Sequence, residues 1–340
     1  MKEIKTQEAL GAILCHDITQ IIPGVKKEAV FKKGHVIKEE DIPVLLSAGK
    51  EHIYVWEAQD GMLHENDAAK ILCEISRGQN LQPSTPKEGK IELTALCDGI
   101  LKVNKVKLNQ LNAMGQISIA SRHGNFPVKA GDKIAGMRVI PLVIEEEKMT
   151  QAKKLCEGEH LFEILPFHSM KVGIVTTGSE VYYGRIQDTF TPVVKEKLRE
   201  VGLQVLGNTV CNDDSKMVTD AILKWIEEGA EMVVCTGGMS VDPDDRTPLS
   251  IKNASDEIVT YGAPVLPGAM FMLAYHGEVP ILGLPGCVMY EKRTIFDLVL
   301  PRLAAKERLK TEDFTTLGEG GLCTSCPICT FPNCGFGKGA

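Results

Sequence analysis

Short apolar runs alternate with amphipathic stretches over residues 170–305. Apolar runs of strand length occupy 171–176, 203–210, 232–235 and 279–284. The stretches at 193–201, 215–226 and 290–303 instead repeat their apolar residues at helical spacing. Buried parallel strands have continuous apolar runs, and the helices that cover them are amphipathic. We therefore predict a three-layer α/β domain with a parallel sheet covered on both faces.

The pattern before residue 170 is less regular. A helix is expected around 42–46, a strand at 52–56 and a second helix over 62–82. Residues 90–145 predict a small mixed region, with a helix at 103–113 and strands at 117–120 and 137–144. The chain then divides into an N-terminal segment, a smaller mixed α+β region, the α/β domain and a Cys-rich tail, over 1–60, 61–169, 170–305 and 306–340.

Composition narrows the class of protein. The 340 residues are 44% hydrophobic and 24% charged, as in globular proteins. A formal net charge of −7 argues against a nucleic-acid partner, because such proteins usually present a basic face. No run reaches 18 apolar residues, and the first residues have no apolar signal segment. We expect no membrane contact and a cytoplasmic location.

Polar and glycine residues follow four of the predicted strands. They are Thr-Gly-Ser-Glu at 177–180, Asn-Asp-Asp at 212–214, Thr-Gly-Gly at 236–238 and Leu-Pro-Gly at 284–286. The carboxyl ends of parallel strands lie at one edge of a sheet, where ligands bind. Glycine allows a backbone to approach a phosphate closely, and carboxylates beside a phosphate require a cation such as Mg²⁺. The sequence therefore predicts a phosphate and Mg²⁺ site at this edge.

Each element also has a purely structural interpretation. The Gly-Gly pair can be an ordinary turn, Asp214 the N-cap of the next helix, and Glu180 a solvated side chain. Asp244 and Asp245, on the loop after the glycines, can be metal ligands or hydrogen-bond acceptors. The coincidence of four such strand ends favours a ligand site.

The order and spacing of these motifs resemble the molybdopterin-binding domain shared by MoaB/Mog proteins and the molybdopterin molybdenumtransferases. Besides the strand ends, the resemblance rests on Gly184 with Asp188, on Met-Ser-Val at 239–241, on Asp245, and on Thr-Pro at 247–248. It covers residues 170–305. Residues 1–56 also resemble the transferase segment that precedes this domain, through Phe-Lys-Lys-Gly at 31–34 and a helix that ends in Ala-Gly at 48–49.

The resemblance implies a ligand, molybdopterin or its adenylylated form, with Mg²⁺ and molybdate beside it. Glu180, Asp214 and Asp245 are the implied catalytic residues. Residues implied to bind the pterin are Thr177, Gly178, Ser179, Asp188, Asp213, Thr236, Gly237, Gly238, Ser240, Thr247, Pro285 and Gly286. Family members often form dimers or trimers, so the resemblance also implies a homo-oligomer.

Two functions remain open. The first is Mg²⁺-assisted insertion of molybdate into molybdopterin, or the adenylylation that precedes it. The second is cofactor binding and delivery without turnover, or redox sensing, with the tail docking a molybdoenzyme. The chain departs from the transferase pattern at Thr189-Phe190 and Asp242, and residues 60–150 contain no Asp-Gly-Tyr-Ala motif. Nicotinamide chemistry is disfavoured, since no G-x-G-x-x-G follows a predicted strand.

Four of the eleven cysteines are concentrated in the tail, at Cys323, Cys326, Cys329 and Cys334. This C-x2-C-x2-C-x4-C spacing predicts either a tetrahedral Zn²⁺ site or an iron–sulfur cluster. The many glycines around it cannot form a core, so a metal would supply the order. The structural alternative is a disordered, thiol-rich tail. The other seven cysteines are scattered, and we interpret them as small buried hydrophobic residues.

Overall fold

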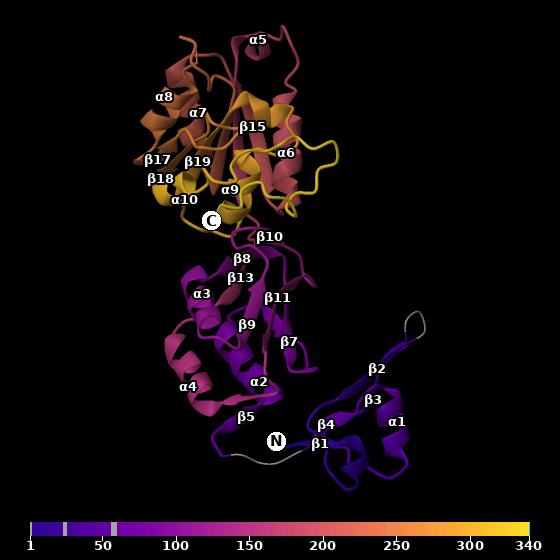
Figure 1. Ribbon diagram of the computed structural model, residues 1–340. Helices are drawn as coiled ribbons and strands as arrows, with labels where there is room; N and C mark the ends of the chain where they lie inside the picture. Colours follow the sequence, from indigo (N-terminus) through magenta and orange to yellow (C-terminus); the bar gives the residue numbers. More distant parts are fainter. Residues whose placement is uncertain (1, 23–25, 56–59, 244, 340) are drawn as a thin grey trace. The chain divides into compact units, whose positions relative to one another are not determined.

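The computed structural model describes residues 2–22, 26–55, 60–243 and 245–339 (Figure 1). Its contacts divide the chain into two compact units. The first holds residues 1–94, 103–122 and 133–163, and the second holds 95–102, 123–132 and 164–340. The division into four segments at 60, 169 and 305 remains a prediction. No helix in the described ranges is long and apolar enough to cross a membrane.

The N-terminal part of the first unit contains two antiparallel strand pairs and one helix. Strand β1 pairs with β4, and β2 pairs with β3. Leu14, Ile37, Leu45 and Ile53 are buried together in its core. The elements are β1 (Lys2–Lys5), η1 (Thr6–Glu8), β2 (Ile18–Ile22), β3 (Lys26–Phe31), α1 (Asp41–Ser47) and β4 (His52–Val55).

The rest of the first unit is built on an antiparallel sheet in the order β6-β7-β11-β9. Side chains of β7 alternate between exposed and buried positions, and α2 packs on β11. The elements are β5 (Met62–His64), α2 (Glu65–Ser76), β6 (Leu81–Pro83), β7 (Lys90–Ala95), α3 (Lys105–Ala113), β9 (Ile117–Ser121), β11 (Lys133–Val139), β12 (Val143–Glu145) and α4 (Glu146–Leu155). The helix predicted over 62–82 is shorter, because β5 pairs with β12 and β6 joins the sheet.

The second unit contains a small sheet in the order β10-β8-β13 and a large six-stranded sheet. The small sheet consists of β8 (Gly99–Val103), β10 (Pro127–Val128) and β13 (Phe162–Pro166). The strands of the large sheet are β14 (Lys171–Thr177), β15 (Gln204–Cys211), β16 (Met232–Thr236), β17 (Glu257–Tyr261), β18 (Met272–His276) and β19 (Val279–Leu284). Its helices are α5 (Ser179–Tyr182), α6 (Phe190–Glu200), α7 (Ser215–Glu227), α8 (Thr247–Ala254), η2 (Gly286–Met289), α9 (Ile295–Ala304) and α10 (Thr311–Thr315).

The large sheet has the order β15-β14-β16-β19-β18-β17. Its first four strands run parallel, and β18 and β17 continue it antiparallel. The mixed α/β class is thus confirmed, but only the first four strands pair in parallel. β17 runs in the same direction as these four, and β18, between β19 and β17, runs in the opposite direction. β17 and β18 were not predicted. β17 mixes apolar with polar residues, and the apolar run of β18 does not by itself show which strand it pairs with. The last long helix begins at Ile295 rather than near 290, because Thr294 and Asp297 form a capping box there.

Helices cover both faces of this sheet, which gives three layers (Figure 1). Neighbouring residues of β16 point to opposite faces. Val234 belongs to the core with α6 and α9, whereas Val233 belongs to the core with α7 and α8. Both cores need apolar side chains, so the strand has the continuous apolar run of a fully buried strand.

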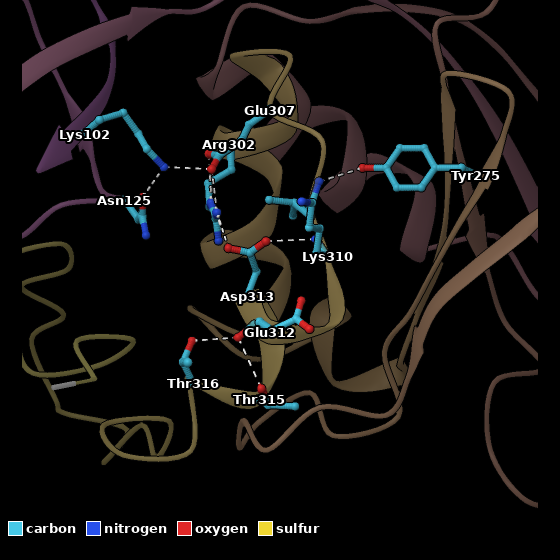
Figure 2. Close-up of polar contacts among 11 residues, drawn as sticks. Lys102, Asn125, Tyr275, Arg302, Glu307, Lys310, Glu312, Asp313, Thr315 and Thr316 are labelled. Carbon is cyan, nitrogen blue, oxygen red and sulfur yellow. Dashed lines mark hydrogen bonds and ion pairs between the residues drawn. The ribbon is translucent and has the colours of Figure 1, made fainter. Parts of the chain in front are cut away.

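A charge network centred on the buried Arg302 joins the end of α9 to α10 (Figure 2). Arg302 is 7% exposed, and its Nε and Nη2 donate to Glu307 at 3.0 and 2.6 Å. Nη2 also donates to Asp313 of α10 at 2.6 Å, and Lys102 Nζ lies 2.7 Å from Glu307. Burial opposes the charge on Arg302, but hydrogen bonds and attraction from Glu307 and Asp313 outweigh it and raise the pKa of Arg302. The network therefore holds in place the helix from which the tail departs.

Candidate functional site

The four polar strand ends lie at one edge of the large sheet. In the parallel register, Thr177 pairs with Cys211, Thr176 with Thr236, and Thr236 with Leu284. The carboxyl ends of β15, β14, β16 and β19 therefore form a row of neighbours, and the predicted site residues follow directly after them. We call this edge, with the loops that leave it, the strand-end site.

Threonine hydroxyls at the base of the strand-end site bond to one another. Thr177 Oγ1 donates to the carbonyl of Thr236 at 3.2 Å and lies 3.0 Å from Thr247 Oγ1. Thr177, Thr236 and Thr247 are 5%, 0% and 1% exposed. These hydroxyls tie β14 to β16 and to the start of α8. They shape the glycine loop from below, while their predicted contact with the pterin remains untested.

The two glycines after β16 have conformations that other residues rarely adopt. The φ angles of Gly237 and Gly238 are +83° and +56°. A Cβ on Gly237 would lie 2.2 Å from the carbonyl oxygen of Thr177, and one on Gly238 would lie 2.9 Å from Thr247 Oγ1. A side chain at either position would therefore displace the loop. The loop needs glycine for its own geometry, and the resulting backbone surface is bare.

Three predicted carboxylates hold the loops themselves. Asp213 Oδ2 accepts from the N–H of Ser179 at 2.9 Å, which joins the loops after β15 and β14. Asp214 Oδ1 accepts from the N–H of Met217 at 2.8 Å, so Asp214 is the N-cap of α7. Asp245 Oδ2 accepts from the N–H of Asp242 at 3.1 Å. Each of these contacts uses one oxygen of the carboxylate.

Asp188 and Glu180 differ in exposure. Asp188 Oδ1 accepts from the N–H groups of Phe190 and Thr191 at 2.9 and 3.0 Å, so it closes the first turn of α6. Glu180 is exposed on α5, and its carboxylate lies 3.2 Å from where a Cβ of Gly178 would be. Of the two, Glu180 is the side chain with freedom to meet a ligand.

The remaining predicted residues border the site. Ser240 is exposed, Pro285 is buried before η2, and Gly286 is exposed. Asp244 lies outside the described residues. Within the described ranges, no group of three or more His, Cys, Asp or Glu side chains is arranged to hold a metal ion. The Mg²⁺ prediction therefore has no preformed ligand set in the part of the chain that the structure describes.

The scattered cysteines and the tail cysteines differ. Burial raises the pKa of Cys211 to about 11, and burial raises the pKa of Cys235 as well. Five of the seven scattered cysteines are buried, whereas Cys97 and Cys287 are partly exposed. All four tail cysteines line one pocket of about 470 Å³, together with residues 290–293. The sequence pattern had not indicated that residues 290–293 share a pocket with the tail.

Two family models match the chain. Residues 173–305 match the family described as a probable molybdopterin binding domain. This segment is therefore a domain of the molybdopterin-binding, MoaB/Mog type, as its motifs predicted. Residues 3–57 match a domain of unknown function, DUF8806. The resemblance of residues 1–56 to the molybdenumtransferases remains a prediction.

Curated relatives share only part of their length with this chain. A Bacillus mycoides protein described as competence-damage inducible is 34% identical over 97 residues, which are 28% of this chain and 23% of that protein. A CinA-like protein of Mycobacterium tuberculosis is 34% identical over 79 residues. These residues are 23% of this chain and 18% of that protein. The chain thus spans less than a quarter of either relative.

The solved structures to which part of the chain is similar include MoaB proteins. MoaB of Thermus thermophilus, titled a molybdopterin biosynthesis enzyme, is 24% identical with a TM-score of 0.36, covering 42% of this chain and 99% of that one. A tungsten cofactor synthesizing protein MoaB from Pyrococcus furiosus is 22% identical with a TM-score of 0.32, covering 39% and 88%.

Proposed function

We propose that the strand-end site binds molybdopterin, bare or adenylylated, and that the protein acts in the handling of the molybdenum cofactor. The observation that carries this proposal is the glycine loop at 236–238, in a domain of the molybdopterin-binding type. Positive φ angles and the close approach to Thr177 leave two consecutive residues without side chains. Such a surface fits a phosphate, which the backbone N–H groups of Gly237 and Gly238 would hold.

The carboxylates have a role that fits this ligand. Asp213, Asp214 and Asp245 each bond to a backbone N–H with one oxygen, so their positions are fixed before any ligand arrives. Their other oxygens, with exposed Glu180, would hold Mg²⁺ beside the phosphate. Bound Mg²⁺ would neutralise the charge between phosphate and carboxylates and so admit the anionic molybdate. A homo-oligomer and a cytoplasmic location belong to the same proposal.

Two modes of action remain within this function. In a catalytic mode, one molybdate oxygen leaves as water with the two dithiolene protons while two Mo–S bonds form. In a binding mode, the protein holds or delivers the cofactor to a molybdoenzyme without turnover. The internal bonds of the three aspartates favour the binding mode, because those bonds account for the side chains without chemistry.

Anaerobic titration of the full chain with molybdopterin tests the proposal. Saturable binding that Mg²⁺ strengthens is expected. A folded protein that does not bind molybdopterin would refute it. Adding molybdate and the adenylylated ligand then separates the modes, since only the catalytic mode forms molybdenum cofactor. Asp245→Asn is the informative variant, because it can keep the bond to Asp242 while it removes a charge.

A further inference from the structure

The Cys-rich tail forms a closed loop on the second unit. The N–H of Gly337 donates to the carbonyl of Gly320 at 2.9 Å, which closes the base of the loop. Leu266 bonds to both Gly321 and Cys323, each at 2.8 Å. A glycine-rich tail without a core is expected to be mobile. Main-chain bonds fix this one at its two ends.

Aromatic contacts hold the far part of the loop. Phe336 is 4% exposed and belongs to the core of the large sheet. The ring of Phe331 lies 5.9 Å from that of Phe126 and 6.2 Å from that of Phe336, measured between centroids. Arg293 places its guanidinium carbon 5.1 Å from the Phe331 centroid. The segment between Gly320 and Gly337 is therefore held in one conformation by these contacts.

This segment lines the pocket of about 470 Å³, and all four tail cysteines are among the lining residues. Cys323 and Cys334 are partly buried and pack against the core, whereas Cys326 and Cys329 are exposed. All four are free thiols. Thiolates are the ligand type that a soft metal centre prefers.

Positive side chains lie beside these thiols. Lys292 Nζ donates to the carbonyl of Pro327 at 3.1 Å, between Cys326 and Cys329 in the chain. Arg293 lines the same pocket and is anchored to Asp297 at 2.8 Å. A centre held by four thiolates carries net negative charge, which such cations stabilise. Lys292 and Arg293 therefore supply the positive charge that such a centre requires.

Spacing and pocket size favour a cluster over a single ion. Three cysteines follow one another at three-residue intervals, as at the start of bacterial iron–sulfur motifs, whereas zinc sites usually join two separated ligand pairs. A zinc ion with Zn–S bonds of about 2.3 Å needs its sulfurs about 3.8 Å apart. In the described part of the chain, no three such ligands are gathered around one point. The pocket of about 470 Å³ has room for a centre that links several metal ions, each held by one thiolate.

We propose that Cys323, Cys326, Cys329 and Cys334 bind a 4Fe–4S cluster in this pocket. Lys292 and Arg293 compensate its charge, and Phe331 and Phe336 shield it from one side. The proposal is independent of pterin binding, because it uses none of the residues predicted to bind the pterin or to act on it.

Anaerobic reconstitution of the full chain with ferrous iron and sulfide is the test. About four irons and four sulfides per chain are expected, with broad visible absorption and a paramagnetic signal after reduction. Cys326→Ser and Cys329→Ser change exposed side chains, so both variants are expected to fold and to lose most of the bound iron. Cys97→Ser, at a partly exposed thiol outside the tail, is the matched control and keeps it.

Two results would overturn the proposal. One is a single zinc or iron per chain without sulfide, or no retained metal. The other is full iron content in both tail variants while circular dichroism shows them folded. Molybdopterin titration of the same variants reports on the strand-end site separately, so a failure of one site is distinguishable from a failure of the other.

Discussion

The strand-end site and the tail pocket differ in how much of their bonding is already made. At the strand ends, Thr177 and Thr247 bond to each other, and Asp213 and Asp214 bond to backbone N–H groups. In the tail, main-chain bonds and aromatic contacts fix the loop, but the four cysteines form no disulfide. The sheet therefore fixes the residues of the strand-end site. In the tail pocket, a bound metal would be needed to fix the cysteine side chains.

This difference separates two ways of building a site. The hydrogen-bond register of parallel strands places their carboxyl ends side by side. The loops that follow these ends are therefore positioned by the buried sheet. A terminal segment without a core gains order from a metal, because metal binding couples to folding. Variants that act on one region and spare the other test the distinction.

The largest expected effect comes from Arg302→Met. It leaves Glu307 and Asp313 without their buried partner, and removing one member of such a network typically costs about 3–5 kcal/mol. Chemical denaturation measures this loss, and limited proteolysis should show the tail after α10 cut first. Lys216→Met is the matched control, because its pair with Asp220 is exposed to solvent and contributes little to stability. Equal losses in both variants would contradict the network's role.

Gly237→Ala should break the strand-end site alone. A left-handed conformation costs an alanine about 1–2 kcal/mol, and its Cβ would meet the Thr177 carbonyl. Molybdopterin affinity should fall at least about tenfold, as measured by anaerobic titration, with iron content unchanged. In Gly335→Ala, nothing lies within 4 Å of the new Cβ, so binding should persist. Unchanged affinity in Gly237→Ala would show that the loop does not hold the ligand.

A smaller effect is expected from Asp214→Ala. Loss of the N-cap of α7 should lower the free energy of unfolding by about 1 kcal/mol. Asp214→Asn keeps an oxygen for the N–H of Met217 and should recover most of that loss. If Asn and Ala destabilise equally, the carboxylate charge matters more than the cap. If Asn restores stability but abolishes turnover, Asp214 serves the catalytic mode.

The smallest effect is a pH dependence at Glu307. Burial favours its neutral form, but Arg302 and Lys102 outweigh burial and lower its pKa. Its contribution to stability is therefore present above the unfolded pKa of about 4.3 and is lost as pH falls through the lower folded pKa. At acid pH, Glu307→Gln should make the free energy of unfolding depend less steeply on pH. The change in slope corresponds to at most about one bound proton. An unchanged slope would count against this pairing.

Some elements could be predicted because the pattern of their apolar residues indicates which of their faces are buried. The run at 279–284 coincides with β19, and the stripe after 215 with α7, since burial on one or two faces leaves a periodic pattern. β17 and β18 were missed. β18 pairs antiparallel with β19 and β17 pairs antiparallel with β18, and a short run does not show in its own residues which strand it will join.

The sites show the same division. Thr177, Gly237 and Asp214 could be named from motif and spacing, and so could the four tail cysteines. The bond between Thr177 and Thr247 joins residues 70 positions apart, and Lys292 reaches Pro327 across 35 positions. Neither contact follows from a local pattern, because each depends on where the sheet places two distant loops.

By itself the sequence determined which residues were available: glycines where strands end, acids after them, and four thiols at short intervals. Hydrophobic periodicity and backbone sterics act over a few residues, so they can be recognised in a single sequence. The tertiary structure alone decided what those residues do for the fold. It used Asp213 and Asp214 to fix loops, buried the threonines beneath the glycines, and set residues 290–293 beside the cysteines, since long-range packing and hydrogen bonding select among many locally acceptable arrangements.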